Sequence, residues 1–161
     1  MDDSGSIIKN NARLVKKGYI QEEIIDYGET YAPVARLKGI KILLAISSML
    51  NFRLFQMDMK SSFLNGFIKE EVHVEQPPGF KDFEFPNHVY KLKKALYGLK
   101  QAPRSWYGRL SEFLMQSGFE RGKIDSTLFI KKAENDLFFV QIYVDDIIFG
   151  STSSLLCQEF S

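Results

Sequence analysis

The segment VQIYVDDIIFGS, residues 140–151, most limits how this 161-residue chain can fold. Two adjacent aspartates, Asp145 and Asp146, separate two strongly apolar runs that have the length and the aliphatic and aromatic content of buried strands. The segment therefore predicts two strands joined at the acids. On its own it favours a hairpin turn, in which aspartate is common. The alternative is a site for a cation.

A cation would explain why two like charges stand together without the glycine that a two-residue hairpin turn prefers. Two unit charges about 4 Å apart repel by roughly 4 kcal/mol at an effective dielectric near 20, and a divalent cation reverses the sign of that interaction. Asp58 adds a third acid, at the end of the apolar segment FRLFQMD. If the strands that end at Asp58 and Asp145 are neighbours, the three carboxylates form a hard-oxygen site suited to Mg²⁺ and to displacement at phosphorus.

Hydrophobic periodicity predicts further elements along the chain. Helices are expected over 37–50 and 102–118, the second with an apolar stripe of Trp106, Leu110, Phe113 and Leu114. Strands are expected within 52–60, 71–80, 88–98, 126–132, 137–144 and 146–150, and a strand or hairpin arm within 2–18. This order, with several antiparallel returns, predicts one α+β domain with helices packed on one face of an antiparallel sheet.

Composition excludes several classes of protein. The net charge is only +1, so a nucleic-acid partner would have to be bound by a local basic patch. Cys157 is the only cysteine, and the two histidines lack the spacing of a zinc site. Neither a secretory signal nor an apolar stretch long enough to span a bilayer is present. We therefore expect a soluble, intracellular chain with a cytoplasmic location and no membrane partner.

Three longer blocks, QMDMKSSFLNG, LKKALYGLKQAPRSWY and YVDDIIFG, occur in this order. Together with ARLVKKGYIQEEIIDYGETYAPVARL and EEVHVEQPPGF, they resemble the reverse transcriptase of copia-type LTR retrotransposons over nearly the whole chain. The resemblance implies an RNA-directed DNA polymerase with a palm and partial fingers. It places fingers-like parts at about 1–36 and 66–95 and the palm at about 37–65 and 96–161, with the thumb and RNase H regions absent.

The resemblance also implies roles for individual residues. Asp58 and Asp145 are the expected metal-bridging catalytic acids and Asp146 the third acid, holding two Mg²⁺ ions, with Mn²⁺ as an alternative. Phe63 falls where the family places the ring that excludes a ribose 2′-hydroxyl, although a buried core phenylalanine is the common interpretation without the family. Nucleotide contacts are further expected from Tyr97, Gly98 and Arg13.

A local run of basic residues without an acid before Glu112 is the expected nucleic-acid surface, the alternative being an ordinary solvated surface. Its members are Lys91, Lys93, Lys94, Lys100 and Arg104. The expected partners are template–primer, dNTPs and the rest of the Pol polyprotein. The isolated fragment is expected to be inactive, and a catalytically dead remnant with residual nucleic-acid binding is the alternative. A ferredoxin-like RNA-binding module is disfavoured because its aromatic signature is missing.

Overall fold

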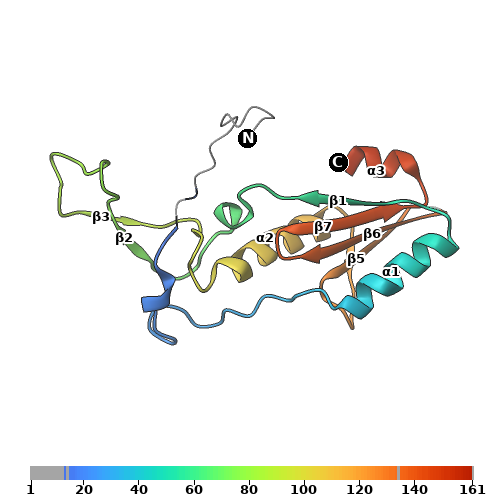
Figure 1. Cartoon of the computed structure of the whole chain (residues 1–161), viewed down its shortest axis with the longest axis horizontal. Coiled ribbons are helices and arrows are strands. Elements are labelled where there is room, and N and C mark those ends of the chain that lie inside the picture. The colour runs from blue at the N-terminus through green and yellow to red at the C-terminus, as the bar shows by residue number, and fades with distance from the viewer. Residues whose placement is uncertain (1–12, 14, 134, 161) are drawn as a thin grey trace, which may run out of the picture.

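The computed structural model describes residues 13, 15–133 and 135–160, and the arm expected within 2–18 lies mostly outside them. In this part of the chain one antiparallel sheet has the strand order β1-β7-β6-β5-β4. Its strands are β1 (Leu54–Asp58), β4 (Glu120–Arg121), β5 (Leu128–Ala133), β6 (Asp136–Tyr143) and β7 (Asp146–Ser151). Strands β5, β6 and β7 follow one another as hairpins, and β1, from the first half of the chain, pairs with β7 at one edge (Figure 1).

Both expected helices are confirmed, as α1 (Leu37–Met49) and α2 (Ala102–Gln116), while α3 (Ser154–Phe160) was not predicted. On α2 the buried residues Trp106, Leu110 and Leu114 recur every fourth position and face the sheet. Phe113 was expected in this stripe, but its side chain is 57% exposed. The buried face of α2 is centred on Leu110 and Leu114, so Phe113 lies to one side of that face and lines a cavity between α2 and α3.

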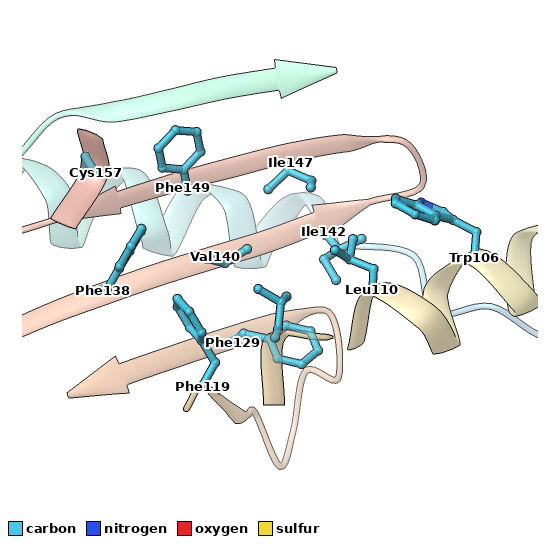
Figure 2. Packing of buried hydrophobic residues seen from close by; sticks show 11 residues of the cluster. Trp106, Leu110, Phe119, Phe129, Phe138, Val140, Ile142, Ile147, Phe149 and Cys157 are labelled. Carbon is cyan, nitrogen blue, oxygen red and sulfur yellow. The ribbon is translucent and has the colours of Figure 1, made fainter. Parts of the chain in front are cut away.

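An aromatic core lies between α2, α3 and one face of the sheet (Figure 2). Phe138 packs edge-on against Phe119 and Phe160, and Phe149 packs against Phe160, with ring centroids 5.0–5.3 Å apart. These contacts account for part of the chain's high phenylalanine content, and each aromatic pair adds about 0.5–1.5 kcal/mol beyond its area burial. The buried members are Trp106, Leu110, Leu114, Phe119, Phe129, Phe138, Val140, Ile142, Ile147, Phe149 and Cys157.

The opposite face of the sheet is covered by α1. Alternation along β7 turns Ile148 away from Ile147 and Phe149, and Ile148 shares a small cavity with three apolar residues of α1. Those residues, Ile40, Leu43 and Leu44, have helical spacing. The α+β class and the antiparallel sheet are confirmed, but the helices lie on both faces rather than on one. The unbroken apolar run Ile147-Ile148-Phe149 is the pattern of a strand buried on both sides.

A separate two-stranded sheet, β2 (His73–Glu75) and β3 (Val89–Lys91), projects away from the main sheet (Figure 1). Two short 3₁₀ turns complete the described elements, η1 (Gly18–Ile20) and η2 (Ser62–Asn65), and η2 lies between β1 and α2. Among the described residues, none of the helices is both long and apolar enough to cross a bilayer.

Candidate active site

The three predicted acids lie at the ends of two adjacent strands. Asp58, the last residue of β1, is the register partner of Asp146, the first residue of β7. Directly paired residues project from the same face of a sheet, with Cβ atoms about 4.5–5.5 Å apart. Asp145 precedes this pair in the hairpin turn, and its carbonyl oxygen accepts a hydrogen bond of 3.0 Å from the backbone N–H of Met59. The strand that ends at Asp58 is therefore the neighbour of β7, which begins at Asp146, whereas β6, which leads to Asp145, lies one strand further from β1.

The turn between β6 and β7 is a two-residue hairpin turn with Val144 and Asp145 at its centre. Val144 has a φ of 57°, and Asp145 is not among the described residues with positive φ. This sign pattern is that of a type II′ turn, whose first central residue is usually glycine. A β-branched residue there is a genuine outlier that costs on the order of 1–3 kcal/mol. The hairpin interpretation of the sequence is thus confirmed, with the turn centred one residue earlier than the two acids.

Hydrogen bonds hold two sides of this turn. Trp106, 4% exposed, donates from its indole N–H to the carbonyl of Val144 at 2.9 Å. Gln56, two residues before Asp58 on the same face of β1, donates from Nε2 to Oδ1 of Asp146 at 3.1 Å. Sequence reasoning missed both contacts because neither residue type signals a partner distant in the chain. Only the fold brings them to the acids.

The donor chemistry of the acids suits a hard divalent cation, which takes oxygen ligands and retains water molecules. Asp58 is exposed and Asp145 and Asp146 are half-buried, so water can reach all three. Within the described residues, however, no three His, Cys, Asp or Glu side chains are gathered closely enough to hold a metal ion. A site made by all three carboxylates would therefore need at least one of them to rotate, while Asp146 can keep its contact with Gln56, which occupies only Oδ1.

Three of the four predicted nucleotide-binding residues lie together. Phe63, in η2, packs against Tyr97 with ring centroids 5.1 Å apart at 47°. The guanidinium of Arg13 lies over the Tyr97 ring, 5.1 Å from its centroid. Phe63 also contacts both hydrophobic clusters of the described core. The core interpretation of Phe63 and its place in a nucleotide site are therefore compatible.

Gly98, the fourth, has a φ of 91° and lies against another stretch of backbone. A Cβ at this position would lie 2.0 Å from the carbonyl oxygen of Lys16. The N–H of Lys16 donates to the carbonyl of Tyr97 at 2.8 Å, so the two segments run side by side. The close approach that requires glycine is to Lys16, and contact of Gly98 with a nucleotide stays a prediction.

The predicted basic surface is divided by acids from distant parts of the chain. Lys91 pairs with Glu71 at 3.0 Å, and this hydrogen bond and charge hold the pKa of Glu71 below its ordinary value. Arg104 pairs with Glu29 at 3.0 Å and also donates to its carbonyl oxygen. The other three members, Lys93, Lys94 and Lys100, are exposed. Lys94 lies over the Phe67 ring, and Lys100 lies over the Tyr27 ring. A count of charges along the sequence could not find these pairs.

Two of the predicted acids thus lie side by side on paired strand ends, and Phe63, Tyr97 and Arg13 contact one another in a separate row. The chain belongs to the reverse transcriptase (RNA-dependent DNA polymerase) family, whose model matches residues 1–161.

The relatives are Pol polyproteins of copia-type retrotransposons. The chain is similar to the Retrovirus-related Pol polyprotein from transposon RE1 of Arabidopsis thaliana, with 41% identity over 96% of this chain and 11% of the relative. It is 39% identical to that from transposon RE2 of the same plant, over 98% of this chain and 11% of the relative. The polyprotein from transposon TNT 1-94 of Nicotiana tabacum is 35% identical over 98% of this chain and 12% of the relative. The chain thus spans about a tenth of their length, and no solved structure matches it.

Proposed function

We propose that this chain forms the polymerase site of a copia-type Pol polyprotein and adds deoxynucleotides to a primer on an RNA or DNA template. Family membership supports the class of reaction. The observation that carries the proposal is the register of β1 and β7, which sets Asp58 beside Asp146 with Asp145 in the adjoining turn. The partners are template–primer, dNTPs and the remainder of the polyprotein.

In this proposal Asp58 and Asp145 hold two Mg²⁺ ions, or Mn²⁺ in their place, with Asp146 next to them. Bound metal would supply the positive charge that stabilises the displacement at phosphorus and favours ionisation of the primer 3′-hydroxyl. The protein's own contribution is placement. Two adjacent strand ends carry the carboxylates, and Gln56 steadies Asp146 through the contact of 3.1 Å. Once the carboxylates have turned onto bound metal, groups held in this way would need little further rearrangement during the reaction.

Phe63, Tyr97 and Arg13 would bind the incoming nucleotide. The Phe63 ring, packed against Tyr97 at 5.1 Å, would lie under the sugar and leave no room for a 2′-hydroxyl. Arg13 would contact the triphosphate, for which a guanidinium is well suited. Phe63 is backed by both hydrophobic clusters, which would resist its displacement by a ribonucleotide.

The two sheets would supply the palm and part of the fingers. The five-stranded sheet carries the acids, while the β2–β3 hairpin forms a sheet of its own within the segment 66–95. The exposed Lys93, Lys94 and Lys100 would face phosphates of the template–primer.

The test replaces the matching segment of the RE1 polyprotein with this chain, so that the remaining polymerase regions are present, and measures primer extension with Mg²⁺. Asp145→Asn is expected to abolish extension. Asp136→Asn is the matched control, since Asp136 lies at the other end of β6, where its carboxylate accepts a hydrogen bond from Thr152. Full extension by the Asp145→Asn protein would refute the assignment.

A second candidate is a domain that binds nucleic acid without catalysis. The observation favouring it is that the described residues gather no metal-binding group of three side chains. It predicts that the same chimeric protein binds template–primer but does not extend it with either Mg²⁺ or Mn²⁺.

A further inference from the structure

The tryptophan of α2 reaches the catalytic hairpin rather than the solvent. Trp106 is the only tryptophan of the chain and is 4% exposed. Figure 2 shows its side chain beside the turn that joins β6 and β7, and its indole N–H donates to the carbonyl of Val144 at 2.9 Å. A buried indole N–H needs such a partner. Because its ring is enclosed, Trp106 is not a platform on which a nucleic-acid base could stack.

The acceptor of this hydrogen bond belongs to the central peptide of the turn. Type I′ and type II′ turns differ mainly by a rotation of that peptide, which changes ψ of the first central residue and φ of the second. The carbonyl of Val144 and the N–H of Asp145 form this peptide, so its orientation sets φ of Asp145 and with it the rotamers that the Asp145 carboxylate can adopt. A donor fixed on the Val144 carbonyl therefore selects one of the two orientations.

The backbone of Val144 is strained, so the turn needs a contact that stabilises this conformation. Val144 has a φ of 57°, which a β-branched residue adopts only at a cost. A glycine would adopt it freely, and the chain has valine there. The strained conformation persists only where its surroundings determine it. The hydrogen bond from Trp106 is such a determinant, next to a residue that the proposed function assigns to catalysis.

The donor itself is held in place by its helix. The start of α2 packs on Gly66, where a Cβ would lie 2.7 Å from the backbone nitrogen of Trp106 and 2.8 Å from the carbonyl carbon of Ser105. The indole therefore extends from a backbone that is packed closely against Gly66.

We propose that Trp106 is a positioning residue for the polymerase reaction: its indole N–H holds the peptide between Val144 and Asp145 in the type II′ orientation and so directs the Asp145 carboxylate. The inference rests on the proposed function for its catalytic consequence. The geometry of the turn is independent of that consequence and can be measured separately.

The kinetic test uses the chimeric RE1 polyprotein that carries this chain. Trp106→Phe keeps an aromatic ring but removes the donor together with the five-membered part of the indole. We expect it to lower kcat for primer extension by about ten- to a hundredfold, the range for a slightly misplaced catalytic group, with KM for dNTP changed less than about threefold. Tyr107→Phe is the matched control, because it removes a hydrogen bond of the same kind from the same helix, the one that the Tyr107 hydroxyl donates to the carbonyl of Ser126 at 2.6 Å, and we expect kcat within about twofold of the parent.

A second variant separates positioning from a general loss of packing. In a Val144→Gly background the turn can adopt positive φ without help, so Trp106→Phe should lower kcat less than about threefold there. An equal loss in both backgrounds, or an unchanged kcat in the single variant, overturns the proposal and leaves the proposed function standing.

The structural test needs no activity. In NMR spectra of the ¹⁵N-labelled chain, Trp106→Phe is expected to shift the amide resonance of Asp145, and Tyr107→Phe is expected to leave it in place. An unmoved Asp145 resonance in the Trp106→Phe protein overturns the proposal. A chimeric parent protein that extends no primer refutes the proposed function, and with it the catalytic consequence, whatever the spectra show.

Discussion

Replacing Gly66 with alanine is expected to destabilise the junction between η2 and α2. Gly66 has an ordinary φ of −73°, so glycine is not required by its backbone conformation. The added Cβ would instead meet the Trp106 nitrogen at 2.7 Å and Ser105 atoms at 2.8 and 2.9 Å. Backbone atoms cannot rotate away, so α2 would have to move. Overpacking of this kind costs about 1–3 kcal/mol, which for a chain of this size lowers Tm by roughly 2–12 °C.

Gly108→Ala is the matched comparison, because Gly108 lies inside α2 and its added Cβ would have nothing within 4 Å. Alanine there should stabilise the helix by about 0.5–1 kcal/mol and raise Tm by roughly 1–4 °C. Thermal unfolding followed by circular dichroism gives both shifts. If the two variants move Tm in the same direction by the same amount, the steric reasoning at Gly66 is wrong.

Three further predictions concern single side chains. Phe63→Val in the chimeric polyprotein should raise ribonucleotide incorporation relative to dNTP incorporation, and unchanged sugar selectivity would leave Phe63 a core residue only. Lys93→Gln should reduce the slope of log affinity against log salt for duplex binding by about 0.9. Lys91→Gln should leave that slope nearly unchanged, because Lys91 is already paired with Glu71. Equal effects of the two variants would contradict the division of the basic surface. The hydrogen bond and charge of Lys91 lower the pKa of Glu71 from 4.5. This pair therefore stabilises the folded chain above that pH, and its contribution is lost as the pH falls through the lowered pKa. Lys91→Gln should raise the Glu71 pKa, measured by carboxylate NMR, toward its ordinary value.

Local patterns predicted the elements of this fold well. The spacing of Ile40, Leu43 and Leu44 predicted α1, and that of Trp106, Leu110 and Leu114 predicted α2. Such patterns report which face of an element is apolar, but they do not say which neighbour covers it. The location of α1 on the second face of the sheet was therefore missed, although the run Ile147-Ile148-Phe149 carried the signal.

In the candidate site, too, local features could be predicted from the sequence and contacts between distant residues could not. The acids could be named from the sequence because a strand end and an acid pair are local features, and their register confirms that they are neighbours. The contacts of Trp106 with Val144, Gln56 with Asp146 and Glu29 with Arg104 join residues 38, 90 and 75 positions apart. Nothing in either member of such a pair marks the other, so these contacts require the folded chain.

Strand β1 lies at the edge of the sheet and pairs there with β7. The sequence around its acid is Met57-Asp58-Met59, and both methionines pack against the aromatic core. Sliding this strand by a single residue in either direction would drive a carboxylate into the phenylalanine cluster and leave a thioether opposite Asp146. A misaligned strand would therefore place a charged carboxylate in an apolar environment, which costs free energy whether or not the chain is catalytic. The one alignment that keeps charge out of the core is also the one that sets Asp58 beside Asp146.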